Sequence, residues 1–238
     1  MEKLKLGAQK LGLDLTNRQL KQFKIYYEEL VEWNKRVNLT SIIGYEEVQI
    51  THFLDSLTVI SGFPSLQPDK RLNTIDVGTG AGFPGILLRI VLPEIRLILL
   101  EATAKKAEFL RHITAKLELD NVEIVRGRAE EVAHDESYRE RFDIVVSRAL
   151  APLNVLAELT LPFCAIGGRL IAQKKGDISQ EMDQASRAVN TLGGEINGVL
   201  DITLDEFDDD RCLVIIDKVK VTPLKYPRRP GIPTKKPI

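Results

Sequence analysis

The residues best suited to binding a ligand form the glycine-rich segment Asp76-Val77-Gly78-Thr79-Gly80-Ala81-Gly82-Phe83-Pro84-Gly85. The segment follows a short apolar run and precedes a helical pattern, so it is expected to connect a strand to a helix. Glycines let the backbone turn sharply and approach a ligand closely. The amino end of the following helix offers free N–H groups, which bind anions. The segment therefore predicts a site for a ligand that carries an acidic group.

Glu101, at the end of the next predicted strand, narrows the choice of ligand to two cofactors. A carboxylate there accepts hydrogen bonds from both hydroxyl groups of a ribose, in dinucleotide sites and in S-adenosylmethionine (SAM) sites alike. Residues 80–85 also fit the G-x-G-x-x-G pattern of dinucleotide-binding loops. The loop and the acid alone leave a nicotinamide cofactor and SAM both open.

Three features favour SAM. Asp76 stands two residues before the first glycine, where dinucleotide sites rarely carry an acid and where it would face the ammonium group of SAM. Arg128-Ala129-Glu130 follows the third predicted strand, where methyltransferases bind the edge of the adenine ring. The last two predicted strands leave no second half of a dinucleotide fold. We therefore predict SAM as the cofactor, with its methionine carboxylate at the helix amino end.

Arg148, at the end of the fourth predicted strand, is the candidate catalytic residue, because this end of an open α/β sheet faces the ligand. The segment lacks the Asp/Asn-Pro-Pro-Tyr/Phe motif of adenine amino methyltransferases, the cysteine of cytosine C5 enzymes and the acid of ribose 2′-O enzymes. What remains is a nucleophile without a proton to remove, such as N7 of guanine. Positioning supplies up to about 7–11 kcal/mol in well-oriented reactions. We expect Arg148 to position cofactor or substrate, without a general base; a strand-end salt bridge is the alternative.

Alternating strands and helices from residue 72 onward predict a parallel sheet with helices on both faces. The last two strands, 195–204 and 211–219, are joined by a linker too short for a parallel crossover, so they must be antiparallel. The predicted fold class is α/β: a class I SAM-dependent methyltransferase, Rossmann-like, with a mostly parallel seven-stranded sheet ending in an antiparallel hairpin. Residues 1–62 form an N-terminal helical region, 63–220 the SAM-binding domain and 221–238 a basic, proline-rich tail. The other expected strands are 72–77, 96–100, 122–125, 142–147 and 169–173, and the expected helices include 50–60, 83–92, 105–117, 152–165 and 178–192. Gly167 and Gly168 are expected to end the helix over 152–165.

In the helical region, a capping box at Thr16–Gln19 precedes an apolar helix face. That face is expected to consist of Leu20, Phe23, Tyr27, Leu30 and Val31. Further on, His52 and Asp55 are spaced to share a hydrogen bond on one helix face. Asn38 and Thr40 are expected to organise a turn.

Charge is unevenly distributed along the chain. The net charge of the 238 residues is −1, but the residues after Asp217 carry seven basic side chains and no acid. Residues 1–217 therefore carry −8, the difference between −1 and +7. A basic segment with five prolines predicts an extended arm that binds RNA, with Tyr226 stacked on a base; a solubilising tail is the alternative. The residues expected to contact RNA are Lys174, Lys175, Arg228, Arg229, Lys235 and Lys236.

Other classes of site are not indicated. The two cysteines, Cys164 and Cys212, are expected to be reduced, buried thiols. No set of side chains has metal-ligand spacing, no apolar run approaches the ~20 residues of a membrane span, and no signal peptide is recognisable. The expected compartment is the cytoplasm.

Nearly the whole chain resembles RsmG (GidB), the family of bacterial 16S ribosomal RNA guanine-N7 methyltransferases. The resemblance rests on the glycine-rich loop, on Arg128-Ala129-Glu130 and Ser147-Arg148-Ala149, and on further motifs. Those motifs are Trp33-Asn34, Asn38-Leu39-Thr40, His52-Phe53-Leu54-Asp55-Ser56 and Lys225-Tyr226-Pro227-Arg228-Arg229-Pro230-Gly231. Where this chain has Glu101, many relatives carry Asp, and the longer side chain should still reach the ribose.

The resemblance implies a SAM-dependent enzyme of ribosomal RNA methylation whose target guanine lies near the decoding region, on the small subunit or its 16S RNA. It implies cofactor contacts at Gly78, Phe83, Ala129, Glu130 and Arg148, with Glu101, Ala102 and Thr103 at the ribose and adenine. Asp76, Gly80 and Gly82 complete the predicted cofactor site. Two alternatives remain: a nicotinamide-dependent oxidoreductase, and a SAM-binding ribosome assembly factor without catalysis.

Overall fold

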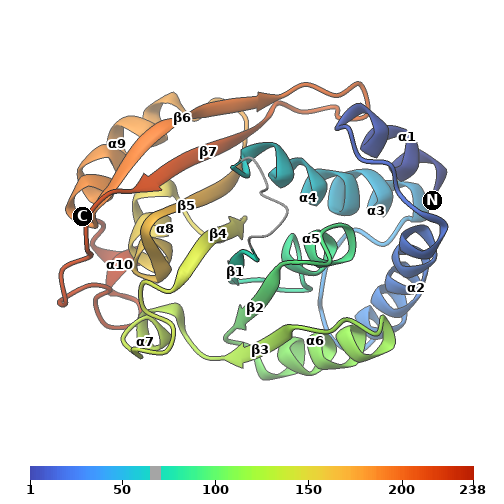
Figure 1. Ribbon diagram of the computed structural model, residues 1–238, viewed down its shortest axis with the longest axis horizontal. Coiled ribbons are helices and arrows are strands. Elements are labelled where there is room, and N and C mark those ends of the chain that lie inside the picture. Colours follow the sequence, from blue (N-terminus) through green and yellow to red (C-terminus); the bar gives the residue numbers. More distant parts are fainter. Residues whose placement is uncertain (65–70) are drawn as a thin grey trace.

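The computed structural model describes residues 1–64 and 71–238, and its strands form one mixed sheet (Figure 1). The strands are β1 (Asn73–Val77), β2 (Arg96–Glu101), β3 (Val122–Arg126), β4 (Phe142–Arg148), β5 (Cys164–Lys175), β6 (Gly194–Ile202) and β7 (Arg211–Lys218). Their order is β3-β2-β1-β4-β5-β7-β6. Strands β1 to β5 are parallel, whereas β7 is antiparallel to both β5 and β6. The predicted fold class is confirmed.

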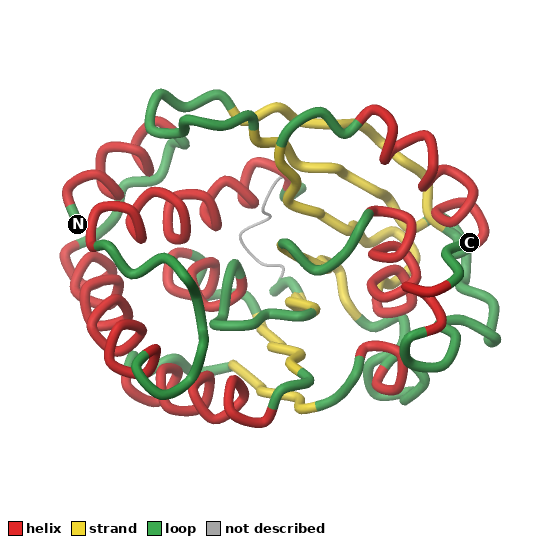
Figure 2. Tube along the Cα trace, turned by 180° about the vertical axis from the view of Figure 1, so that it is seen from behind, coloured by secondary structure: helices red, strands yellow, loops and turns green. Residues whose placement is uncertain are grey.

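Helices cover both faces of the sheet, and the two chain ends lie on opposite sides of the molecule (Figures 1 and 2). After the sheet begins, the helices are α5 (Gly85–Val91), α6 (Ala104–Lys116), α7 (Ala129–Val132), α8 (Leu153–Thr160), the 3₁₀ turn η3 (Leu161–Phe163), α9 (Ser179–Thr191) and α10 (Ile232–Lys235). Before it lie α1 (Glu2–Lys10), α2 (Asn17–Asn34), α3 (Tyr45–Val48), the π-helical turn η1 (Gln49–Leu54), α4 (Asp55–Leu57) and the 3₁₀ turn η2 (Thr58–Gly62).

Successive strand side chains point to opposite faces, so each face of the sheet has hydrophobic packing of its own. Ile75 and Val77 of β1 belong to the core that includes α8 and α9. On the opposite face, Leu97 and Leu99 of β2 pack in a core with α5, α6 and the N-terminal helices. The N-terminal helices are therefore a layer of the same domain, lying over the face that carries Asp76.

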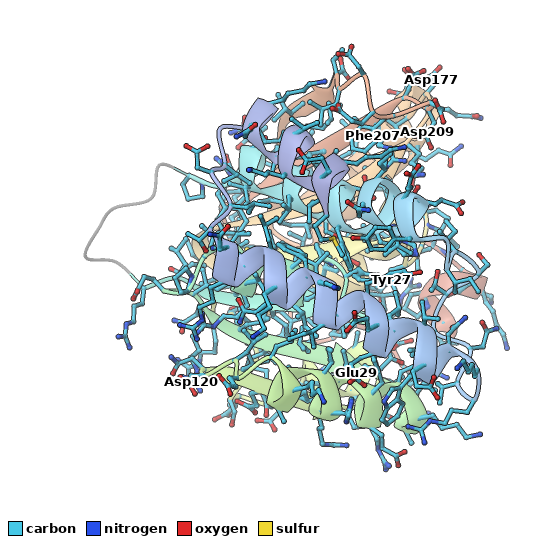
Figure 3. All side chains as sticks on the ribbon, turned by 90° about the vertical axis from the view of Figure 1, so that its right-hand side faces the viewer. Tyr27, Glu29, Asp120, Asp177, Phe207 and Asp209 are labelled. Carbon is cyan, nitrogen blue, oxygen red and sulfur yellow. The ribbon has the colours of Figure 1, made fainter. Side chains whose placement is uncertain are left out.

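Helix α2 begins with the predicted capping box: Thr16 Oγ1 accepts a hydrogen bond from the Gln19 backbone N–H at 3.3 Å, and Gln19 Oε1 accepts from the Thr16 N–H at 2.9 Å. Its buried face differs from the predicted one. Tyr26 is fully buried, whereas Tyr27 is only partly buried. Figure 3 shows α2 along this side of the molecule, with Tyr27 and Glu29 labelled on it.

Two predictions about chain segments are wrong. The helix expected over 152–165 ends at Thr160, and the glycines at 167 and 168 lie inside β5, where the pairing with β4 shifts register between Phe142 and Ile144. A Gly-Gly pair fits a strand irregularity as well as a helix end, and the partner strand decides between them.

The C-terminal tail is not an extended arm. It packs against α7 and α8: His134 Nε2 donates to the Pro227 carbonyl oxygen at 2.8 Å, and Arg139 donates to the Tyr226 carbonyl oxygen at 2.9 Å. The Tyr226 side chain is 9% exposed, so it is part of the core and does not offer a ring for stacking on a base. The predicted stacking role of Tyr226 is therefore wrong.

Candidate active site

The side chain of Asp76 stabilises the glycine-rich loop by hydrogen bonds to two other residues of the loop. Asp76 Oδ2 accepts hydrogen bonds from Thr79 Oγ1 at 2.6 Å and from the Gly85 backbone N–H at 2.8 Å. The Gly85 N–H belongs to the amino end of α5, which the sequence analysis assigned to the methionine carboxylate of SAM. In the structure, the carboxylate at this helix end is that of Asp76.

The Asp76 carboxyl group is completely buried, and burial raises its pKa to about 7, although its hydrogen bonds to Thr79 and Gly85 oppose that rise. Its second oxygen, Oδ1, is buried and has no hydrogen-bond partner among the described residues. A buried acceptor without a partner is energetically costly. The loop therefore holds one unsatisfied carboxylate oxygen beneath its backbone.

Three of the four glycines in the segment, Gly78, Gly80 and Gly82, have positive φ angles, which favour glycine, but their surroundings differ. A Cβ atom at Gly82 would lie 2.6 Å from the Tyr26 hydroxyl oxygen, and one at Gly78 would lie 2.6 Å from Leu150 Cδ1. At Gly80 the nearest atom would be a backbone oxygen at 4.0 Å. Of the three, Gly80 is thus where a ligand has room to approach the backbone.

Tyr26 of α2 holds the middle of the loop. Its hydroxyl donates a short hydrogen bond to the Ala81 carbonyl oxygen, in the middle of the loop. Its ring packs against the Phe83 ring, with 5.6 Å between centroids. The N-terminal helical region therefore helps to shape the candidate cofactor site. The sequence analysis did not select this residue.

Glu101 ends β2 beside the loop and is 7% exposed. Its Oε2 accepts from the Gly80 N–H at 3.0 Å, and its Oε1 accepts from the Thr103 N–H at 2.7 Å. Ala102 and Thr103 follow it and are exposed. The Glu101 carboxylate thus joins the glycine-rich loop to the segment that follows β2. It lies at the position predicted for a ribose-binding acid.

Ala129 and Glu130 begin α7, after β3, and both are partly exposed. Glu130 Oε1 accepts a hydrogen bond from the Gly231 N–H of the tail at 3.1 Å. The residues expected at the adenine edge are therefore in direct contact with the C-terminal segment, a link that no local pattern in the sequence indicated.

Arg148, at the end of β4, points into the N-terminal helices. Its Nη2 donates to the Thr51 carbonyl oxygen at 2.9 Å and to His52 Nδ1 at 3.1 Å, and its Nε lies 3.2 Å from Asp55 Oδ2. Asp55 also pairs with Arg211 at 2.7 Å. Arg148 therefore forms a strand-end salt bridge, which was the alternative to a positioning role. The side chain anchors the helical layer to the carboxyl end of β4.

The six residues predicted to bind RNA fall into two groups. Lys174 forms an ion pair with Glu181, Lys175 lies 2.8 Å from Asp209, and Arg228 makes a bidentate pair with Glu158, at 2.9 Å and 2.6 Å. Glu158 is almost completely buried, so Arg228 holds the tail in place. The other three are exposed: Arg229, Lys235 and Lys236.

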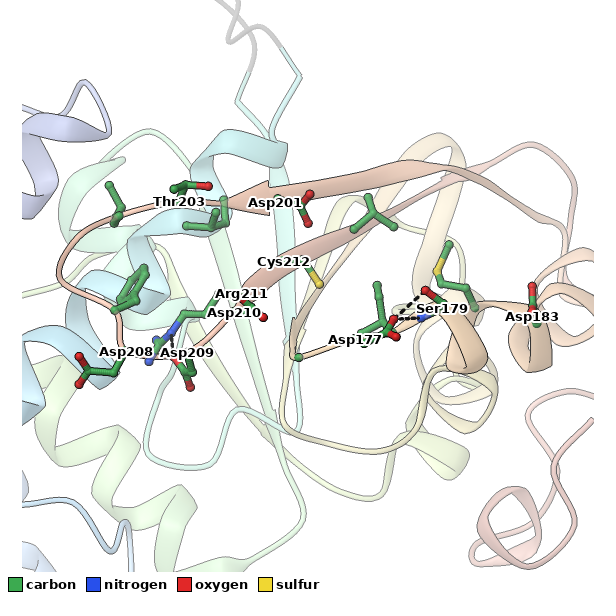
Figure 4. A pocket seen from close by; sticks show the side chains of 17 residues that line it. Asp177, Ser179, Asp183, Asp201, Thr203, Asp208, Asp209, Asp210, Arg211 and Cys212 are labelled. Atoms are coloured by element: carbon green, nitrogen blue, oxygen red, sulfur yellow. Dashed lines mark hydrogen bonds and ion pairs between the residues drawn. The ribbon is translucent and has the colours of Figure 1, made fainter.

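A separate groove of about 860 Å³ lies between the β6–β7 connection and the start of α9 (Figure 4). Its walls carry six aspartates: Asp177, Asp183, Asp201, Asp208, Asp209 and Asp210. Figure 3 shows Asp177, Phe207 and Asp209 together at one end of the molecule, away from Glu29 of α2. These carboxylates give the groove a negative charge, which repels phosphates.

Comparison with known proteins assigns the family. The sequence profile of GidB, the rRNA small subunit methyltransferase G family, matches residues 19–204. The chain belongs to this family. A protein from Dehalococcoides mccartyi named ribosomal RNA small subunit methyltransferase G is 51% identical over 238 residues, covering 100% of both chains. One of the same name from Alkaliphilus metalliredigens is 45% identical, over 99% of this chain and 97% of that one.

Solved structures with low sequence identity share the fold. Geranyl diphosphate C-methyltransferase from Streptomyces coelicolor A3(2), in complex with S-adenosyl-L-homocysteine, has a TM-score of 0.53 at 15% identity over 82% of this chain and 98% of that one. A geranyl diphosphate methyltransferase bound to sinefungin has a TM-score of 0.57 at 13% identity over 85% and 100%. The predicted SAM-dependent methyltransferase is confirmed, and the oxidoreductase and the non-catalytic assembly factor are not favoured.

Within residues 1–64 and 71–238, no group of three or more His, Cys, Asp or Glu side chains is placed to hold a metal ion. Over the same ranges, no helix is both long enough and apolar enough to cross a membrane. Cys164 and Cys212 are buried and unpaired, as predicted.

Proposed function

We propose that this enzyme transfers the methyl group of SAM to N7 of a guanine in 16S ribosomal RNA, near the decoding region. The observation that carries the proposal is that no carboxylate or imidazole at the carboxyl ends of β1 and β4, within the described part of the chain, is available as a general base. Asp76 is completely buried, Asp55 is paired with two arginines, and both ring nitrogens of His52 have partners. Guanine N7 has a lone pair and no proton, so its methylation needs no base.

The residues of the loop suit SAM. Gly80 leaves room for a ligand against the backbone, and Asp76 Oδ1 is an unpartnered acceptor of the kind an ammonium group would satisfy. Glu101 already accepts two backbone hydrogen bonds, but a carboxylate has about four lone-pair sites and can still accept from ribose hydroxyls. When bound, SAM supplies a methyl group on a positively charged sulfonium.

Further residues complete the proposed cofactor site. Ala102, Thr103, Ala129 and Glu130 lie after β2 and β3, on the side assigned to adenine. Gly78, Gly82 and Phe83 set the shape of the loop from within, since the first two are packed against Leu150 and Tyr26. Arg148 positions the helical layer, and through it the substrate, because its donors are all directed to that layer.

For RNA, we propose that the exposed basic side chains of the folded tail form the contact surface. Arg229 lines a hollow of about 540 Å³ together with Lys225, Leu224 and Ile232, and Glu130 and Glu131 also line it. Leu224 is 82% exposed, so the surface offers apolar area as well as positive charge. This combination suits RNA, whose phosphates are bound by basic groups and whose unpaired bases pack on apolar or planar groups. Lys174, Lys175 and Arg228 contribute less, because each is already in an ion pair.

The test is methyl transfer from radiolabelled SAM to small ribosomal subunits, and in parallel to protein-free 16S RNA, from cells that lack this protein. We expect label in one or both, released as 7-methylguanine and mapped to one guanine by mass spectrometry. Label on another atom or another base would overturn the proposed reaction. SAM binding without transfer to either substrate would support the assembly factor instead.

A further inference from the structure

A chain of polar contacts links the N-terminal layer to the end of β4 and has no role in the function described so far. Asn34 Oδ1 accepts from the Thr40 N–H at 3.0 Å and fixes the turn that contains Thr40. Thr40 Oγ1 lies 2.7 Å from His52 Nε2, and His52 Nδ1 lies 3.1 Å from Arg148 Nη2. The sequence analysis selected each of these residues without assigning a common role to them.

The chemistry of Arg148 decides which ring nitrogen of His52 carries the proton. A guanidinium group can only donate hydrogen bonds, so Nδ1 of His52 must accept from Arg148. In the neutral ring the proton is then on Nε2, which donates to Thr40 Oγ1. Burial, together with the positive charges of Arg148, Lys175 and Arg211, lowers the pKa of His52 to about 4, although a hydrogen bond to the Thr51 backbone opposes that fall. The imidazole is therefore neutral near pH 7, in a single tautomer.

This tautomer determines what the Thr40 hydroxyl group can still do. Its oxygen accepts from His52 Nε2 and also from the Ile42 N–H at 3.1 Å. A hydroxyl group has two acceptor lone pairs and one donor, so both lone pairs are used and the hydrogen remains. Among the described residues, no other acceptor for this hydrogen is found within hydrogen-bonding distance. Thr40, which is partly exposed, is thus held as a donor only.

The location of this donor is next to the proposed reaction site. The His52 ring stacks on Phe83 of the glycine-rich loop, with 4.8 Å between centroids. Arg148 ends β4, the neighbour of β1, and the strand order reverses between these two strands. Ligands of open α/β sheets bind outside the carboxyl ends of the strands at such a point. A substrate base presented to a cofactor in the loop would therefore lie beside His52 and Thr40.

We propose that Thr40 donates its hydroxyl hydrogen to O6 of the target guanine, with His52 and Arg148 as the positioning residues that keep Thr40 a donor. The inference rests on the proposed guanine-N7 reaction. Guanine presents O6 and N7 as adjacent acceptors, whereas adenine presents an amino group in place of O6. A hydroxyl group fixed as a donor accepts guanine and leaves the adenine amino group facing another donor. Thr40 thus selects the base whose N7 is methylated.

The test pairs a change in the enzyme with a change in the substrate. Thr40→Val keeps the shape and removes the hydroxyl group, and Thr40→Ser restores it. The substrate is 16S RNA, in the subunit if required, with either guanine or 2-aminopurine at the mapped target position; 2-aminopurine keeps N7 and lacks O6. We expect kcat/KM to fall by about tenfold in wild type when guanine is replaced, and by about tenfold in Thr40→Val on guanine. In Thr40→Val, replacement should change kcat/KM only by the difference in N7 nucleophilicity between the two bases.

The comparison of two enzymes on two substrates is a double-mutant cycle. It cancels any difference in N7 nucleophilicity between the two bases, because that difference affects both enzymes equally. Thr40→Ser should behave as wild type. His52→Phe keeps a ring on Phe83 and removes both nitrogens, and it should lose discrimination as Thr40→Val does while SAM affinity stays within about twofold. If Thr40→Val and wild type lose the same factor on 2-aminopurine, the contact to O6 does not exist. If wild type forms no 7-methylguanine at all, the proposed reaction fails instead.

Discussion

Asp76 shows how a single residue can be costly for folding and useful for binding. A carboxyl group with a buried, unpartnered oxygen destabilises the folded state when it is ionised. Its other oxygen closes the loop through Thr79 and Gly85, so the residue cannot be removed without loosening the site. Residues of this kind are common at functional sites, where stability is given up for a poised group.

The raised pKa of Asp76 predicts a pH-dependent effect of Asp76→Asn on stability. The pKa is about 7 in the folded protein, against an ordinary value of 3.8. Between these values the folded state binds more protons than the unfolded state, so the contribution of Asp76 to the free energy of unfolding falls as pH rises, until about pH 7. The amide cannot ionise. We expect Asp76→Asn to be more stable than wild type at pH 8 by on the order of 2–4 kcal/mol, with little difference near pH 4.

Urea unfolding at several pH values measures this, with Asp14→Asn as the control, because Asp14 is exposed. SAM affinity should fall in Asp76→Asn and not in the control, since the variant loses the acceptor charge beneath the loop. Two stability curves that run parallel from pH 4 to 8 would show that Asp76 titrates normally.

At the scale of elements, α2 is a wall of the cofactor site. The hydrogen bond from Tyr26 to the Ala81 carbonyl oxygen is the contact that joins the helix to the loop. A Cβ atom at Gly82 would meet the same hydroxyl group, so Gly82 makes room for Tyr26 and not for a ligand. Substitution at Gly82 would therefore disturb the packing of α2 and would be a poor test of cofactor contact.

Tyr26→Phe is the better test of this coupling. It removes one hydroxyl group and leaves the Ala81 carbonyl oxygen buried without that donor, which costs about 1–3 kcal/mol. We expect SAM binding, measured by calorimetry, to weaken by several-fold while thermal unfolding remains cooperative. Tyr27→Phe is the matched control, because the Tyr27 hydroxyl donates to the Ile43 carbonyl oxygen at a more exposed position. Equal SAM affinity in wild type, Tyr26→Phe and Tyr27→Phe would show that α2 does not contribute to the cofactor site.

Periodicity and turn residues predicted where the strands lie along the chain, because the alternation of apolar residues is a local property. The alternation of strands with helices and the short last connection predicted which strands are parallel and which antiparallel. The features that were missed depend on distant partners. Tyr26 and Tyr27 are adjacent aromatic residues, and only the position of the loop decides which one is buried. Gly167 and Gly168 were assigned to a helix end because the pairing of β5 with β4 is not visible in the sequence.

The candidate site was predicted in part for the same reason. The strand pattern correctly placed the loop, Glu101 and Arg148 at the carboxyl ends of β1, β2 and β4. The Arg148 guanidinium forms an ion pair with Asp55, a partner 93 residues earlier in the chain, and lies 5.8 Å from the centroid of the Phe83 ring of the loop. The tautomer of His52 follows from the contact between its Nδ1 and Arg148, which no pattern in the sequence indicated.

At the scale of the whole molecule, charge is separated toward opposite sides. The acidic groove adjoins the β6–β7 connection, which lies beside α1, where Lys10 pairs with Glu206 at 2.8 Å. The basic tail lies on the other side of the molecule (Figure 1). We therefore expect a polyanion such as RNA to approach the tail and to be repelled by the groove.

Within the tail, two adjacent arginines are predicted to have opposite roles. Arg228→Ala leaves Glu158 buried without its bidentate partner, and removing one member of a fully buried pair costs about 3–5 kcal/mol. Because the Arg228 side chain is 28% exposed, we expect a somewhat smaller loss, about 2–3 kcal/mol, in the free energy of unfolding. The loosened tail should also weaken SAM binding, since Gly231 bonds to Glu130.

Arg229→Ala, in contrast, should leave stability within about 0.5 kcal/mol of wild type, because the side chain is exposed. It should weaken RNA binding and reduce the slope of log affinity against log salt concentration by about 1, since one phosphate contact is lost. RNA binding at four or more salt concentrations, urea unfolding and SAM titration on both variants distinguish the two roles. A wild-type salt slope in Arg229→Ala would remove this residue from the RNA surface. Unchanged stability in Arg228→Ala would mean that the tail is not held by Glu158, and the extended arm would then become the better description of it.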